Sequence, residues 1–190
     1  MKTAPRRGRW RAAAAPHAAI AALLLAACAT APPRGETGID GIACAAPDGT
    51  LPAALQWLPD AAVPRAAEGA SGRGGICRGR VYAVREPMPV HRLWDEARRN
   101  DHGHWWTLHA PSGSRDDYRH AYAVCSEWNA LDHAITCTLQ PGARVVVGSG
   151  QSADCTAVNY AKSPLLQVYV PADAPDGALP LLECRVRPYP

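Results

Sequence analysis

The sequence contains no phenylalanine and has no large excess of charge of either sign. Its 190 residues include 20 Lys and Arg against 17 Asp and Glu, and five of the basic residues lie in residues 1–27, which hold no acidic residue. The rest of the chain has 15 basic against 17 acidic residues, a net charge of −2. This balance argues against a basic nucleic-acid-binding surface. The hydrophobic fraction of 47% is typical of a globular chain, and the length fits one domain with a short extension.

Apolar runs long enough to cross a membrane are also missing from the sequence. A transmembrane helix needs roughly 20 apolar residues. The stretch from Ala12 to Ala27 is shorter and is interrupted by Pro16 and His17. Because it follows a basic N-terminus, it is typical of a secretory signal peptide.

The end of this stretch, Leu25-Ala26-Ala27-Cys28, resembles the bacterial lipoprotein box. The resemblance implies cleavage before Cys28 and acylation of its thiol and new amine, which would anchor the protein in a membrane. Ordinary cleavage after Ala31 is the alternative, and both readings place the mature chain outside the cytoplasm. We therefore expect a signal peptide (1–27), a lipidated tether (28–43) and one domain (44–190), located in the cell envelope at the outer membrane or periplasmic face.

No cysteines have the C-x-x-C spacing, which argues against a zinc knuckle or a thioredoxin-like site. Without Cys28 the chain has an even number of cysteines, as expected for disulfides in an exported domain. They are Cys44, Cys77, Cys125, Cys137, Cys155 and Cys184. Pairing in chain order predicts Cys44–Cys77, Cys125–Cys137 and Cys155–Cys184, although the sequence leaves the other pairings open.

The hydrophobic patterns favour an α+β fold, with mainly antiparallel sheets, one or two short helices and disulfide staples. A helix is predicted over 115–124, capped by Ser114, and a shorter one over 52–58; a helical turn is expected over 95–99. The predicted strands are 80–85, 90–94, 104–108, 134–139, 143–148, 165–170 and 181–186.

Three kinds of side chain in these strands suggest a binding cleft. Arg92 shares a strand face with Val90 and Trp94, so we expect it to be buried and to pair with an anion. That anion is either a protein carboxylate or a ligand phosphate. Trp105 and Trp106 point to opposite faces of their strand, one filling the core and the other offering a ring for stacking.

Gln167 is a polar residue between the apolar Leu166 and Val168, so it either faces solvent or lines the same cleft. The pair His102 and His104 has a spacing that zinc could use, but no third ligand follows at a standard spacing, so we expect no metal site.

Taken in order, short motifs over about 90–170 resemble the bacterial ADP-ribosyltransferase-like and NAD-glycohydrolase toxin domains. They are Arg92-x-Trp94, Gly103-x-Trp105-Trp106-Thr107, Pro111 with Tyr118-Arg119, the run from Leu139 to Gly148, Tyr160, and Gln167-Val168-Tyr169-Val170. The resemblance implies an ADP-ribosyltransferase-like fold that takes NAD as substrate and requires no cofactor.

Carried onto this sequence, the resemblance implies that Arg92 grips the NAD phosphates and that Thr107 stands at the hydroxyl position of the central strand. It also implies that Gln167 contacts the nicotinamide ribose, with Trp105 and Trp106 beside the ring. Glutamine in place of glutamate favours hydrolysis over ADP-ribosyl transfer. The alternative function is a non-catalytic envelope lipoprotein that binds a protein or small ligand through a Trp-rich face.

Overall fold

The computed structural model describes residues 37–99, 101–173 and 177–190. The expected signal peptide, Cys28 and the first part of the tether lie outside the described residues. Within the described part, no helix has the length and apolar character needed to cross a membrane.

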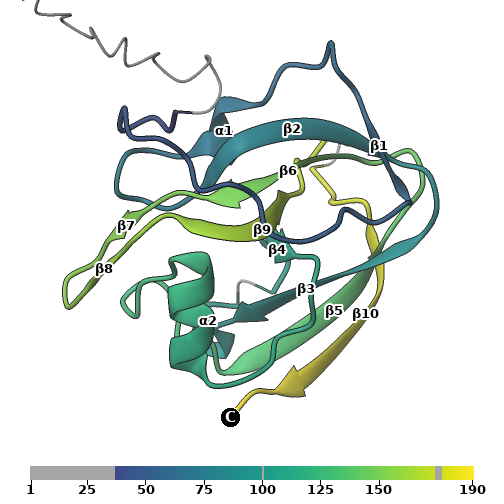
Figure 1. The fold of residues 1–190 in the computed structure, drawn as a ribbon. Helices are drawn as coiled ribbons and strands as arrows, with labels where there is room; N and C mark the ends of the chain where they lie inside the picture. Colours follow the sequence, from purple (N-terminus) through teal and green to yellow (C-terminus); the bar gives the residue numbers. More distant parts are fainter. Residues whose placement is uncertain (1–36, 100, 174–176) are drawn as a thin grey trace, which may run out of the picture. The chain divides into compact units, whose positions relative to one another are not determined.

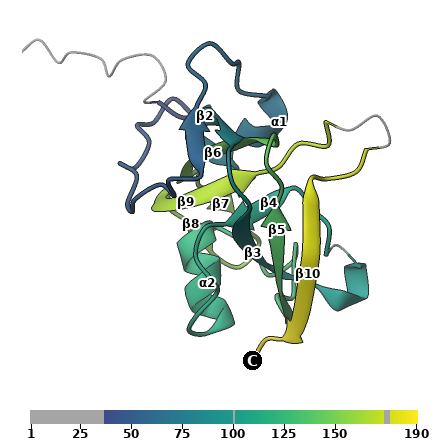
Figure 2. The same cartoon turned by 90° about the vertical axis from the view of Figure 1, so that its right-hand side faces the viewer.

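The described chain is built on one eight-stranded sheet in which every pair of neighbouring strands is antiparallel (Figures 1 and 2). The strand order is β1-β2-β6-β9-β4-β3-β5-β10. These strands are β1 (Leu55–Trp57), β2 (Ile76–Val84), β3 (Met88–Trp94), β4 (Trp105–Thr107), β5 (His133–Leu139), β6 (Arg144–Gly150), β9 (Ser163–Tyr169) and β10 (Leu181–Pro188). A separate hairpin joins β7 (Ala153–Asp154) to β8 (Asn159–Tyr160).

The sheet folds around one main core, so that strands far apart in the strand order share buried side chains. Val84 of β2, Val145 of β6, Val168 of β9, Val90 of β3 and Leu139 of β5 all belong to this core. In the figures the β1-β2-β6-β9 half and the β3-β5-β10 half lie against each other, with the short β4 between them. The α+β character predicted from the sequence is confirmed.

Helix α2 (Arg115–Tyr122) confirms the main predicted helix and begins at the predicted cap. The Ser114 hydroxyl accepts from the Asp117 backbone N–H at 3.1 Å, and an Asp117 carboxylate oxygen accepts from the Ser114 N–H at 2.8 Å. This reciprocal pair satisfies N–H groups that the first turn leaves free. The predicted turn near 95–99 is a 3₁₀ helix, Glu96–Arg98.

The predicted helix over 52–58 is wrong. Residues Leu55–Trp57 form the edge strand β1, which pairs with Tyr82–Val84 of β2. Pairing with an existing strand satisfies the backbone of so short a segment better than an isolated helix, whose nucleation is costly. The four-residue α1 (Arg65–Glu68) and the β7–β8 hairpin were not predicted, because such short elements show no periodicity.

Of the three predicted disulfides, Cys44–Cys77 is confirmed and the other two are wrong. The observed bonds are Cys125–Cys155 and Cys137–Cys184. Cys137 lies on β5 and Cys184 on β10, and these strands are hydrogen-bonded neighbours although 47 residues separate the two cysteines. Pairing in chain order failed because the topology brings together cysteines that are not consecutive.

Residues 37–43, which the sequence assigns to the tether, contact the rest of the chain. Thr37 and Ala43 form a β-bridge with each other, and the Lys162 ammonium joins the segment to the rest of the chain by donating to the Asp40 carboxylate at 2.7 Å. The Cys44–Cys77 bond follows directly, so the chain is fixed to the sheet from this point on.

Two leucines at the β5–β10 border test this account of the core. Leu139 is fully buried, whereas Leu182 is 56% exposed. We expect Leu139→Ala to lower the free energy of unfolding by about 2–5 kcal/mol, because it removes buried methyl groups and leaves a cavity. Leu182→Ala should change it by less than about 0.5 kcal/mol. Urea unfolding followed by circular dichroism measures both, and equal effects would contradict the assigned burial.

Candidate functional site

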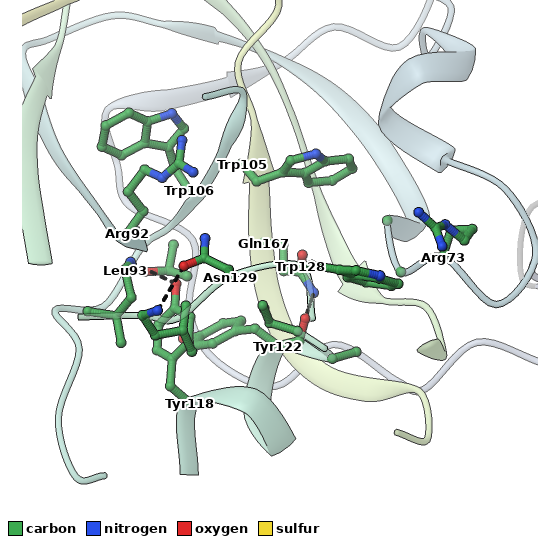
Figure 3. Close-up of a pocket in the computed structure, with 16 residues that line it drawn as sticks. Arg73, Arg92, Leu93, Trp105, Trp106, Tyr118, Tyr122, Trp128, Asn129 and Gln167 are labelled. Atoms are coloured by element: carbon green, nitrogen blue, oxygen red, sulfur yellow. Dashed lines mark hydrogen bonds between the residues drawn. The ribbon is translucent and has the colours of Figure 1, made fainter. Parts of the chain in front are cut away.

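One pocket, of about 230 Å³, gathers all five residues that the sequence singled out for a cleft. They are Arg92, Trp105, Trp106, Thr107 and Gln167. They come from strands β3, β4 and β9, which are neighbours in the sheet. The rest of the wall comes from α2, the segment 123–131 and the loop 73–75. In Figure 3, Arg92 and Trp106 lie at one end of the pocket, and Arg73 and Trp128 lie at the other.

The Arg92 guanidinium is buried in this pocket without a counter-ion. The residue is 7% exposed, and its Nε and Nη1 atoms are enclosed with no hydrogen-bond partner. Burial lowers the pKa of the guanidinium, an effect that Tyr118 and Asp101 oppose through the electrostatic field. No ion pair of Arg92 with a carboxylate occurs among the described residues. Of the two partners expected for Arg92, a protein carboxylate within ion-pair distance is therefore not found among the described residues, and the ligand anion stays a prediction.

Trp106 and Gly103 hold this guanidinium in place. The Trp106 ring is 1% exposed, its Nε1 donates to the Gly103 carbonyl at 2.8 Å, and the guanidinium carbon of Arg92 lies 5.6 Å from the ring centroid. A side chain at position 103 would overlap Arg92 Nη1 and bring Cβ to 3.0 Å from its Cζ. Trp106 thus fills the core, whereas Trp105 is partly exposed and its ring lies edge-on to Tyr169 with centroids 5.1 Å apart; its role in stacking stays a prediction.

Gln167 lies on β9 opposite Thr107 of β4 and is 7% exposed. Its amide Nε2 donates to the Tyr122 carbonyl at 3.4 Å, which directs the carboxamide toward the pocket wall formed by α2 (Figure 3). Gly150 on the neighbouring β6 leaves the necessary space, because a Cβ there would lie 2.6 Å from Gln167 Nε2. The carboxamide is therefore fixed by packing rather than by another charged group.

The Thr107 hydroxyl is hydrogen-bonded to backbone carbonyl groups of the protein. Its oxygen lies 2.8 Å from the His109 carbonyl oxygen and 3.1 Å from the His91 carbonyl oxygen. Its single proton donates to these two acceptors. The hydroxyl also interacts with the hydroxyl groups of Tyr118 and Tyr122, and burial raises the pKa of both tyrosines. Both tyrosines thus stay protonated at neutral pH. Thr107 supports these two rings and does not present a free nucleophile.

The segment 123–131 contributes pocket residues that the sequence analysis missed, among them Trp128 and Asn129. Arg119 of α2 holds both ends of the segment, because its Nη1 and Nη2 donate to the Val124 and Ala130 carbonyls at 3.3 Å each. A lone Trp followed by Asn, just after a predicted helix, is the one sequence signal that could have drawn attention to it.

The segment 123–131 is cross-linked to the residues that follow β7. The Cys125–Cys155 bond links the two, and beside it the Glu127 carboxylate accepts from the Thr156 backbone N–H at 2.8 Å. This polar contact lies at the surface, so the covalent disulfide is the stronger of the two links to residues 155–156.

The histidine pair does not converge on a metal site. The His104 ring contacts the Val170 carbonyl at 2.8 Å, whereas His102 pairs with Asp101 at 3.0 Å. Within the described residues, the one group with metal-ligand geometry is Cys125, Glu127 and Cys155. Its two cysteines form a disulfide, so these residues do not fit a metal ion.

No protein-family model matches the sequence, and the curated proteins hold no match either. Among solved structures, the chain is similar to one titled "Structure of Tne2 in complex with Tni2", with a TM-score of 0.43 and 14% sequence identity. The similarity covers 59% of this chain and 92% of that chain. A likeness of this size assigns neither fold nor function.

The role of Gly103 is testable by adding one methyl group. We expect Gly103→Ala to push the Arg92 guanidinium out of its place and to destabilise the protein by about 1–3 kcal/mol, because the pocket end is already filled. The ¹⁵N shift of Arg92 Nε and the thermal midpoint report the two effects. An unchanged Arg92 signal would mean that Gly103 does not define the guanidinium position.

The structure offers a matched pair of disulfides for a second test. We expect the double variants Cys125→Ser/Cys155→Ser and Cys137→Ser/Cys184→Ser each to lose about 2–4 kcal/mol of stability. Only the first should speed amide hydrogen exchange in 123–131, because only the Cys125–Cys155 bond restrains the pocket wall. Equal exchange in this segment in the two variants would contradict that assignment.

Proposed function

We propose that the pocket binds NAD and that the domain cleaves the nicotinamide–ribose bond, acting as an NAD glycohydrolase within an ADP-ribosyltransferase-like fold. The observation that carries this proposal is the buried, unpaired Arg92 guanidinium in one pocket with Gln167 and Trp105. A guanidinium presents a planar fork of N–H donors that matches two phosphate oxygens. Burial of a guanidinium without a counter-charge is costly, and a diphosphate bound beside it would supply that charge.

The size of the pocket favours partial enclosure of such a ligand. Its volume of about 230 Å³ lies below the roughly 300–1,000 Å³ of sites that enclose a whole drug-sized molecule. In the proposal the reacting half of NAD occupies the pocket, with its diphosphate at Arg92 and its planar ring beside Trp105. The adenosine half extends beyond the opening.

The proposed reaction breaks the bond between the ribose C1′ and the pyridinium nitrogen. Nicotinamide leaves with the bonding electron pair and becomes neutral, and positive charge develops on the ribose. The Gln167 carboxamide oxygen is the dipole placed to face that charge, and such fixed dipoles stabilise a transition state without reorganisation. A water molecule then bonds to C1′ and releases its proton to solvent, which yields ADP-ribose.

Gln167 bears on the choice between hydrolysis and transfer. Its carboxamide has no charge with which to activate a protein acceptor, so water is the favoured acceptor. ADP-ribosyl transfer would use the same pocket and the same bond cleavage, with another nucleophile in place of water. Thr107 supports Tyr118 and Tyr122, which close the pocket floor.

The proposal includes export. Lipidation at Cys28 would anchor the domain in the cell envelope, and three disulfides suit an oxidising compartment. The three cross-links also distinguish this chain from a typical cytosolic enzyme, in which such bonds are rare.

Incubating the full, oxidised chain with NAD and measuring released nicotinamide by chromatography tests the function. We expect Gln167→Ala to lower kcat by roughly 10²–10³-fold, the usual cost of removing one aligned dipole from an active site. Arg92→Lys keeps the charge but loses the fork, so it should raise KM more than it lowers kcat.

Gln56→Ala on β1 and Arg185→Ala on β10 are the matched controls, since both positions are exposed and lie outside the pocket lining. They should release nicotinamide like the wild type. Activity that survives both pocket substitutions would refute the site assignment. Absence of release from correctly folded protein would favour the non-catalytic binding alternative.

A further inference from the structure

The pocket has a second arginine at the end opposite Arg92. Arg73 and Trp128 both line it, and the Arg73 guanidinium carbon lies 4.8 Å from the centroid of the Trp128 ring. Figure 3 shows these two side chains on the far side of Gln167 from Arg92. The pocket therefore carries an arginine stacked on a tryptophan at each end.

Arg73 resembles Arg92 in having no carboxylate partner. None of the ion pairs found among the described residues includes it. A guanidinium stacked on an aromatic ring keeps its edge N–H groups available, because stacking uses only the face of the plane. The outer end of the pocket thus presents free donors to an anion.

The backbone around Arg73 is fixed. The Gly74 N–H donates to the Ser152 carbonyl at 3.0 Å, and the Asp154 N–H donates to the Gly72 carbonyl at 2.8 Å. Residue 73 itself bridges to Ala153. The loop is therefore joined to the chain on both sides of Arg73, unlike a free surface loop.

Trp128 is fixed to the same part of the chain. The Cys125–Cys155 bond and the contact from Thr156 to Glu127 anchor its segment one to three residues away. Arg73 and Trp128 come from segments far apart in sequence, yet both are tied to residues 152–156. This shared anchor is what a preformed outer subsite requires.

We infer that Arg73 on Trp128 forms a second anion subsite, and that the preferred substrate is a dinucleotide carrying an anionic group in addition to its diphosphate. The inference rests on the proposed function and specifies its substrate class. Two dinucleotides meet the requirement: one with a carboxylate on the pyridine ring (nicotinic acid adenine dinucleotide) and one with a phosphate on the adenosine ribose (NADP).

Titration of the full, oxidised chain with three dinucleotides distinguishes these sources. Quenching of the pocket tryptophans reports binding of NAD, NADP and nicotinic acid adenine dinucleotide separately. We expect one of the last two to bind roughly tenfold more tightly than NAD, as for one added charge-assisted contact. The dinucleotide that binds more tightly than NAD identifies the position of the second anionic group.

Arg73→Gln should remove that preference, so that the affinity for the preferred dinucleotide falls roughly tenfold relative to the affinity for NAD. Arg80→Gln is the matched control, because Arg80 also stacks on a tryptophan, Trp57, at 5.2 Å, but lies outside this pocket. It should keep the preference. The preference should also weaken as salt rises, because the outer end is open to solvent.

Equal affinities for the three dinucleotides, or a preference that survives Arg73→Gln, would overturn the inference. Release of nicotinamide from NAD by the same wild-type sample keeps the two claims apart. If NAD is cleaved without any preference, only the outer subsite fails. If none of the three dinucleotides binds, both the proposed function and this inference are refuted.

Discussion

The arrangement of the pocket depends on a guanidinium that is removed from water without an opposite charge. Arg92 is 7% exposed and two of its nitrogen atoms lack an acceptor, a state that costs several kcal/mol unless a partner is bound. The surrounding residues maintain this state: Trp106 supports the guanidinium and Gly103 leaves its space free. An apolar residue at this position would avoid that cost, and in the proposed function the bound diphosphate offsets it.

The alternation of side chains along the strands made part of the pocket predictable from the sequence. Because side chains alternate across a strand, Val90, Arg92 and Trp94 had to share a face, and the structure buries all three. The same rule separated Trp105 from Trp106. Gln167 and Thr107 lie opposite each other because β4 and β9 are neighbours in the sheet, a pairing that the sequence suggested only through resemblance. The helix α2 was predictable because its capping residues are local.

The features of the pocket that the sequence did not predict depend on contacts between distant parts of the chain. Cys125 could have paired with any other cysteine on the basis of spacing, and the actual choice of Cys155 follows from where the β7–β8 hairpin packs. Trp128 and Asn129 lie in a segment without periodicity, which Arg119 and the disulfide shape into a pocket wall. Arg73 lies within the glycine-rich run 69–75, whose composition suggests a flexible loop, whereas hydrogen bonds of Gly72 and Gly74 to residues 152–154 fix its backbone.

These distant contacts make the two ends of the pocket unequal. The Arg92 end is formed by adjacent strands of the sheet and depends on core packing, whereas the outer end is held by a disulfide and exposed polar contacts. Thiols stay reduced in a typical cytosol and are oxidised after export. A chain that has not been oxidised would therefore keep the strands that carry Arg92 but lose the covalent restraint on Trp128. In the proposed function, the complete pocket would form only after the chain has left the compartment in which it is made.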